Sequence, residues 1–156
     1  MGAFYTRARV VFLLVVLLLA APVAMAQSQS APATPLRLVL RGYDPVAYFT
    51  DGKPTPGKPE FETEFDGGRY RFASARHLEQ FKADPDRYLP QFGGSCAGMM
   101  SRNVKVEADP ENWLLVDGKL YVFLGPVNKQ RSREEFDRLV ASARSNWRNL
   151  KDKPFQ

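Results

Sequence analysis

Sulfur and imidazole side chains are scarce in this sequence, which contains a single cysteine, Cys96, and a single histidine, His77. One cysteine cannot form a disulfide within the chain. It also cannot supply the Cys-x-x-Cys pairs of zinc ribbons, thioredoxin-like redox centres or c-type haem attachment sites. The His-Glu-x-x-His pattern of zinc proteases is absent as well. The sequence therefore excludes these motif-defined classes, and the fold must be stabilised by its hydrophobic core without a disulfide.

The charged residues are mixed in sign, and no stretch combines clustered lysine and arginine with aromatic side chains. The formal net charge of +5 over 156 residues is ordinary for a soluble protein. Asp109, Glu111 and Asp117 have the spacing of turn and cap residues, and the glycine pairs do not match a phosphate-binding loop. We therefore expect no nucleic-acid partner.

The one long apolar run, Val10–Ala21, has the surroundings of a secretory signal peptide. Arg7 and Arg9 precede it, and Ala24-Met25-Ala26 follows it as an A-x-A cleavage site. The alternative is an uncleaved membrane anchor, but a span needs about 20 apolar residues. Pro22 also interrupts this one. We expect cleavage after Ala26 and a soluble periplasmic or secreted protein that has no membrane contact once the signal is removed.

The remaining chain is the size of one domain. Residues 27–40 begin with a Gln, Ser, Ala, Pro and Thr stretch and are predicted to be a flexible tether, with the domain at 41–150 and a short C-terminal tail at 151–156. No repeat of fixed period is evident in the sequence.

Two stretches are typical of β-hairpins. In the first, Phe61 and Phe65 precede an Asp66-Gly67-Gly68 turn, and further aromatic residues follow it. In the second, 113–116 and 120–124 flank Asp117-Gly118. Both have the alternating apolar pattern and the Asp-Gly signal of a tight turn.

Cap residues and helical spacing predict the helices. Asp44 with Pro45 favours a short helical turn at 44–49, and Ser74 is placed to cap a helix at 75–83. A capping box begins the C-terminal helix, and its apolar stripe is Phe136, Leu139, Val140, Ala143 and Trp147. The fold class that we predict is α+β: one small domain of two β-hairpins with short helices and a C-terminal helix.

The stretch "YRFASARHLEQFKADPDRY" resembles the YHS domain, whose signature is an aromatic strand, a serine, a helix with a phenylalanine and a closing Pro-x-x-Tyr. The matching residues are Tyr70, Phe72, Ser74, Phe81, Pro85 and Tyr88. With "GYDPVAYF" upstream and "QFGGSCA" downstream, the chain is similar to exported, single-domain YHS proteins of bacteria over about Arg41–Leu150. The resemblance implies a small domain of the predicted size.

Members of the wider YHS group occur beside copper and heavy-metal transport machinery, so the resemblance also suggests metal handling. The version found there carries one cysteine directly after the aromatic strand and another four residues later. This sequence has Ala73 and His77 at those places. The resemblance therefore leaves only His77 as a ligand at that site, and for the exported branch it implies no established chemistry.

Cys96, Met99 and Met100 lie at positions i, i+3 and i+4, which fall on one face of a helix. Thiolate and thioether donors together select Cu(I), so the cluster is a candidate copper site. The same spacing is typical of a buried apolar stripe, and cysteine and methionine pack well in cores. A reactive thiol or an intermolecular disulfide is a third interpretation of Cys96.

His77 is the only imidazole available for ligation or catalysis. A Cys96–His77 dyad would have a nucleophile and a base, but the sequence shows neither an orienting third group nor an oxyanion loop. We therefore expect a binding protein and not an enzyme.

The prediction for function is an exported soluble binding protein that holds copper, as Cu(I), through Cys96, Met99, Met100 and His77. The alternative is a structural or interaction module that binds an unknown protein partner and no metal. A thiol-dependent enzyme is the third hypothesis.

Overall fold

The computed structural model describes residues 35–128 and 131–156, and Pro35–Gln156 forms one compact unit. The predicted signal peptide at 1–26 and most of the predicted tether lie outside the described residues. Within the described ranges, no helix has the length and apolar character needed to cross a membrane.

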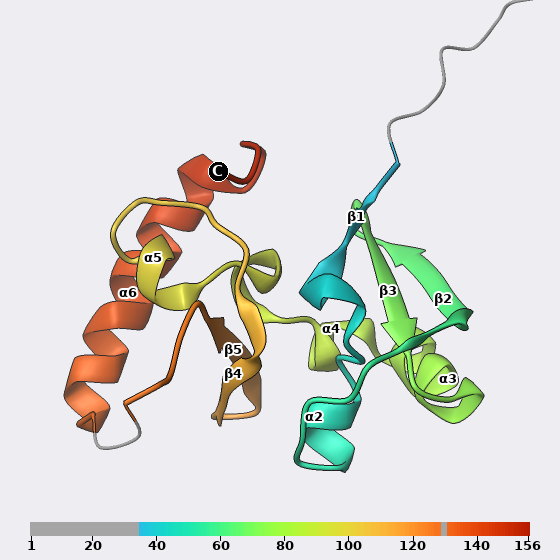
Figure 1. Ribbon diagram of the computed structural model, residues 1–156. Helices are drawn as coiled ribbons and strands as arrows, with labels where there is room; N and C mark the ends of the chain where they lie inside the picture. The colour runs from blue at the N-terminus through green and yellow to red at the C-terminus, as the bar shows by residue number, and fades with distance from the viewer. Residues whose placement is uncertain (1–34, 129–130) are drawn as a thin grey trace, which may run out of the picture. The chain divides into compact units, whose positions relative to one another are not determined.

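The first half of the domain, residues 37–88, is built around a three-stranded sheet (Figure 1). The strand order is β1-β3-β2, with β1 parallel to β3 and β2 antiparallel to it. Its elements are β1 (Arg37–Leu38), a 3-10 turn η2 (Val39–Gly42), α2 (Ala47–Thr50), β2 (Lys58–Phe65), β3 (Gly68–Phe72), α3 (Ala75–Ala83) and α4 (Pro85–Tyr88).

The second half, residues 89–156, is built around a two-stranded antiparallel sheet and ends in the long C-terminal helix (Figure 1). Its elements are η3 (Gln91–Gly94), α5 (Ala97–Met100), β4 (Asp109–Val116), β5 (Lys119–Phe123) and α6 (Arg133–Leu150). The α+β class, both hairpins, the short helices and the C-terminal helix are confirmed. The cap of α3 at Ser74 and the capping box of Ser132 with Glu135 are confirmed as well.

The Asp-Gly turns form for the reason that the sequence suggests. Both central residues have positive φ, 45° and 70° at Asp66 and Gly67, and 52° and 68° at Asp117 and Gly118. Aspartate and glycine tolerate this conformation best, and it matches the twist of a two-residue hairpin.

The two hairpins are copies of one design. The strand pairs Lys58↔Phe72 and Phe65↔Gly68 of the first recur as Asp109↔Phe123 and Val116↔Lys119 in the second. Each ladder also has its irregularity at the same place, between its first two registered pairs. The strand pairing therefore recurs once, 51 residues further along the chain, as a structural repeat that the sequence analysis did not detect.

The repeat extends upstream of the hairpins. In η2, Leu40, Arg41 and Gly42 have φ values of 52°, 51° and 86°, and Phe92, Gly93 and Gly94 of η3 have 55°, 59° and 77°. The chain then runs into Asp44 in the first half and Cys96 in the second. The Asp44 N–H donates to Thr55 O at 2.9 Å, and the Cys96 N–H donates to Val106 O at 3.0 Å. Asp44 and Cys96 therefore occupy the same position.

Traces of the repeat survive in the sequence of the hairpins. Identical residues stand at six places in "KPEFETEFDGGRYRF" and "DPENWLLVDGKLYVF". They are the Pro-Glu near the start, the Asp-Gly of the turn, and the Tyr and Phe of the returning strand. A comparison of the chain with itself is the signal that would have found the duplication.

The domain begins earlier than the predicted boundary at residue 41. Val39 and Leu40 are each only 2% exposed, so residues 37–40 belong to the domain and not to a tether. The predicted tail at 151–156 is also hydrogen-bonded to the domain. The Lys105 ammonium donates to Lys151 O at 2.7 Å and to Lys153 O at 2.6 Å. Burial lowers the pKa of Lys105, and the nearby Arg37 lowers it further.

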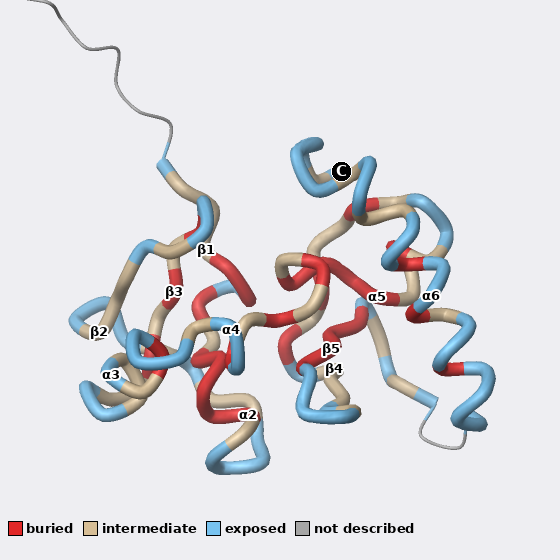
Figure 2. The backbone as a smooth tube through the Cα atoms, turned by 180° about the vertical axis from the view of Figure 1, so that it is seen from behind, coloured by how far each residue is buried: buried red, intermediate tan, exposed pale blue. Residues whose placement is uncertain are grey.

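The two halves share one core. Buried residues concentrate in η2 and α2 of one half and in η3, α5 and β5 of the other. Figure 2 shows the buried stretches at α2 and β5 in red. Across the junction, the Tyr48 hydroxyl donates to Pro110 O at 3.0 Å, and its ring meets Trp113 edge-on at 5.2 Å between centroids. A Cβ on Gly94 would lie 3.3 Å from Val39, so the two turns approach closely.

Candidate functional site

The Asp44 carboxylate is the most heavily bonded buried acceptor of the first half. It is fully buried and lies between η2 and α2. One oxygen accepts the N–H groups of Val46 and Ala47, at 2.8 and 3.3 Å, just before α2. The helix itself begins at Ala47, later than the predicted turn at 44–49, and its cap position is Val46. The other oxygen accepts the N–H of Ala73, at 2.8 Å, and contacts His77 Nδ1 at 2.6 Å. Four partners therefore use both oxygens, as a buried carboxylate requires.

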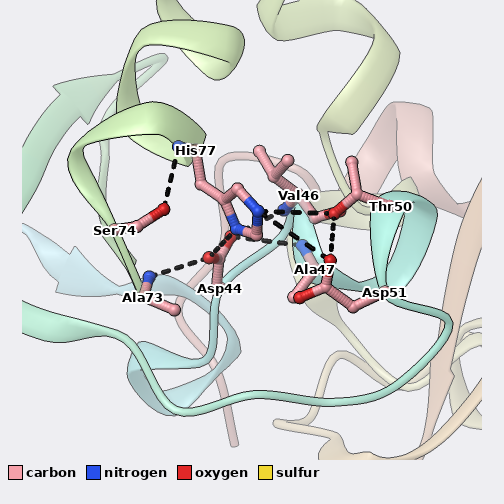
Figure 3. A network of polar contacts seen from close by, with 8 residues as sticks. All are labelled: Asp44, Val46, Ala47, Thr50, Asp51, Ala73, Ser74 and His77. Carbon is pink, nitrogen blue, oxygen red and sulfur yellow. Dashed lines mark hydrogen bonds and ion pairs between the residues drawn. The ribbon is translucent and has the colours of Figure 1, made fainter.

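This arrangement fixes the imidazole of His77. The side chain projects from the first turn of α3 onto Asp44, and Figure 3 shows the ring between Asp44 and the end of α2. Since an ionised carboxylate can only accept, Nδ1 carries the hydrogen of this contact. In the neutral ring, the lone pair then resides on Nε2. The side chain is 12% exposed, so Nε2 is close to the surface.

Two polar side chains at the end of α2 face Nε2. Thr50 Oγ1 lies 3.4 Å from it and an Asp51 carboxylate oxygen lies 3.9 Å from it (Figure 3). The Thr50 hydroxyl is also within 3.2 Å of Val46 O and 2.8 Å of the Asp51 carboxylate. We call Asp44, Thr50, Asp51 and His77 the imidazole site.

The predicted sulfur cluster lies in the second half. Cys96 is 3% exposed, Met100 is fully buried, and Met99 packs against the core from a partly exposed position. The Cys96 sulfur accepts the N–H of Leu124 at 3.2 Å. These surroundings are those of core side chains, and they agree with the buried apolar stripe that the sequence offered as the alternative to a copper site.

The four predicted ligands are not brought together. His77 is in α3, which packs on β2, β3 and α4, whereas the sulfur residues are in and next to α5, which packs on α6 and β5. Both views place α3 and α5 in opposite halves (Figures 1 and 2). In the part of the chain that the structure describes, no three His, Cys, Asp or Glu side chains are grouped to hold a metal ion.

The repeat explains what Cys96 does locally. In the first half the Asp44 carboxylate accepts the N–H of Ala73, the residue after β3. In the second half the Cys96 sulfur accepts the N–H of Leu124, the residue after β5. Each side chain therefore ties the turn before the hairpin to the end of its last strand.

Sequence reasoning missed Asp44 as the partner of His77, and it missed Thr50 and Asp51 altogether. It recognised Asp44 only as a helix cap. The available signal was the Asp-Pro of "GYDPVAYF", because an aspartate that caps with one oxygen keeps the other for a second partner.

The imidazole site has the order of groups of a hydroxyl, base and carboxylate triad, but its hydroxyl is poorly placed for attack. The 3.4 Å separation is long, and the single hydrogen of Thr50 has two nearer acceptors. What the geometry does provide is an oriented Nε2 lone pair beside a carboxylate. That is the arrangement by which proteins prepare a histidine ligand, with its other nitrogen bonded to a carboxylate.

A family model for the YHS domain matches residues 46–92, so the chain contains a YHS domain there. The match covers His77, Thr50 and Asp51, and it ends before Cys96. It is thus confined almost wholly to the first half and is shorter than the stretch that the sequence suggested. No curated protein and no solved structure matches the chain significantly.

Proposed function

We propose that this chain is an exported binding protein whose YHS domain binds a transition metal ion at the imidazole site, with His77 Nε2 as the first ligand. The observation that carries this proposal is the 2.6 Å contact between Asp44 and His77 Nδ1. It orients the ring and makes Nε2 a better donor. Asp51 stands 3.9 Å from Nε2 and is the second ligand of the proposed site.

Copper is the ion that we expect. Imidazole and carboxylate donors suit Cu(II), which binds such sites more tightly than the other divalent first-row ions. The family's association with copper and heavy-metal transport supports the same choice. Two protein ligands leave the other positions on the ion to water or to a partner protein, so the affinity is moderate and the ion is exchangeable.

A competition titration with Cu(II) and a chelator of known affinity tests the proposal. His77→Gln should weaken binding at least tenfold, because it removes the only imidazole of the chain. Asp51→Asn should weaken binding by a smaller factor. The matched control is Cys96→Ser, which alters a potential ligand outside the imidazole site and should leave Cu(II) affinity unchanged. Equal affinity of wild type and His77→Gln would overturn the proposal.

The second candidate is a Cu(I) site at Cys96, Met99 and Met100, which the clustering of these sulfurs around α5 favours. Their burial opposes it, since α5 would have to open before an ion reached the thiol. The same titration with Cu(I) on reduced protein separates the two. Loss of Cu(I) binding in Cys96→Ser, with His77→Gln unaffected, would favour the sulfur site.

If neither ion binds, the interaction module without metal becomes the better account of the domain. Export is tested separately by intact-mass analysis of the periplasmic and secreted fractions. The expected mass is that of a chain beginning at Gln27, as the A-x-A site predicts. Recovery of the full-length chain from membranes alone would contradict the proposed localisation.

A further inference from the structure

A cavity of about 440 Å³ lies between the hairpin of the second half and α6. Its wall is mainly apolar, and the residues that form it include Gly98, Leu114, Val116, Phe123, Phe136 and Leu139. This volume is within the range of pockets that hold small organic molecules.

The first half shows what fills the corresponding space there. Val116 and Phe123 are the counterparts of Phe65 and Phe72 in the repeated hairpin. In the first half, the rings of Phe65 and Phe72 pack on Phe81 of α3, with centroid distances of 5.8 and 5.1 Å. The hairpin surface that packs against the Phe81 ring in the first half therefore lines an open cavity in the second half.

The connection after each hairpin accounts for the difference. Residues 73–74 alone separate β3 from α3, so α3 must lie directly on its hairpin. Residues 124–132 separate β5 from α6, which lets α6 pack on α5. Leu139 stands as far after the cap Ser132 as Phe81 does after Ser74, yet it lines the cavity and does not fill it.

We propose that this cavity binds a small ligand with an aromatic body and one anionic group. We infer the aromatic body because the corresponding hairpin surface of the first half binds the aromatic ring of Phe81. The anionic part follows from charge, because Arg131 and Arg133 line the cavity and no acidic side chain of the described residues does. Arg133 is already paired with Asp117 and Asp137, so Arg131 is the cation proposed to meet the ligand. The proposal is independent of the imidazole site.

Gly98 allows a direct test of the cavity. A Cβ built there would lie 3.9 Å from Phe123 and from the Cys96 sulfur, which is ordinary contact, and the φ of Gly98 is not positive. Gly98→Leu should therefore extend a side chain into the cavity without backbone strain. Gly125→Leu is the matched control, because a Cβ on Gly125 meets nothing within 4 Å and Gly125 does not line the cavity.

The experiment is a fluorescence titration of the full chain with 1-anilinonaphthalene-8-sulfonate, an aromatic anion. Wild type should bind it saturably at one site, Gly98→Leu should lower the affinity at least tenfold, and Arg131→Gln should lower it several-fold. Gly125→Leu should bind like wild type. Cooperative thermal unfolding of each variant in parallel identifies any that has lost its native fold.

Amide chemical-shift mapping on wild type keeps the proposal falsifiable if Gly98→Leu does not fold. The dye should then shift the amides of Gly98, Phe123 and Leu139 and not those around His77. Absence of saturable binding, shifts elsewhere, or unchanged affinity in a folded Gly98→Leu would each overturn the proposal.

Discussion

The two halves of this domain place different side chains at the same backbone position. Asp44 and Cys96 follow the same strained turn and each accepts the N–H group that follows a hairpin. The carboxylate can accept more hydrogen bonds than one amide supplies, and it uses them to orient His77. The sulfur is a weak acceptor and has no such second task. One scaffold thus supports a polar site in one half and apolar packing in the other.

The helices that follow the two hairpins also differ, in what they pack against. In the first half α3 lies on its hairpin and carries His77 to Asp44. In the second half α6 packs on α5, and an apolar cavity remains beside the hairpin. The family match covers the first half almost alone. The half that the family model matches is thus the half that contains His77, and the cavity lies in the other half.

The largest expected effect on stability comes from Phe81, whose ring fills the space on the first hairpin that stays an open cavity on the second. Phe81→Ala removes a ring that is 1% exposed and should cost about 3 to 5 kcal/mol of unfolding free energy. Leu139→Ala, at the matching position of α6, should cost less than about 2 kcal/mol, since its side chain already borders a cavity. Urea denaturation measures both, and equal losses would break the comparison.

A smaller difference is expected between the two matched acceptors. Asp44→Asn puts an amide group among four donors and should cost about 3 kcal/mol, because a buried donor is left without a partner. Cys96→Ser keeps an acceptor for Leu124 N–H and should cost about 1 kcal/mol. Thermal unfolding of the two variants compares them. A larger loss of stability in Cys96→Ser than in Asp44→Asn would contradict this ranking. It would show that the second half depends more on the Cys96 sulfur than the first half depends on the Asp44 carboxylate.

The smallest effect is confined to alkaline pH and to the first half. Burial raises the pKa of Tyr70 from 10.0 to about 12, while Arg37 opposes the shift. The folded chain therefore keeps a proton that the unfolded chain releases, so this stabilisation is complete below pH 10 and is lost as pH rises towards 12. Tyr70→Phe should flatten the fall in stability over that window, measured by denaturation at several pH values. An unchanged slope would contradict the assignment.

Local sequence signals predicted the secondary structure well. The Asp-Gly turns, the alternating aromatics and the caps at Ser74 and Ser132 act within a few residues, and each forms as expected. The duplication was missed because the two hairpins share only scattered identities, six in fifteen positions. The early start of the domain was missed because Val39 and Leu40 are buried by residues far along the chain, such as Gly94.

The site was harder to predict than the fold. Sequence spacing grouped Cys96, Met99 and Met100 correctly, but helical spacing alone does not distinguish a ligand face from a core face. The sequence singled out His77, yet its partner Asp44 is 33 residues away. That contact exists only because β3 brings the start of α3 against the turn after η2. Contacts between distant segments are what local patterns do not encode.

The most direct test of the central claim, that the polar site belongs to the first half, uses the paramagnetism of Cu(II). A substoichiometric addition to isotope-labelled protein should broaden the amide signals of Thr50, Asp51 and His77 first. Signals of Cys96 and Leu124 should stay sharp, because the second half carries no part of the proposed site. Early broadening around Cys96 and Leu124, with His77 unaffected, would contradict the account and place the metal in the second half.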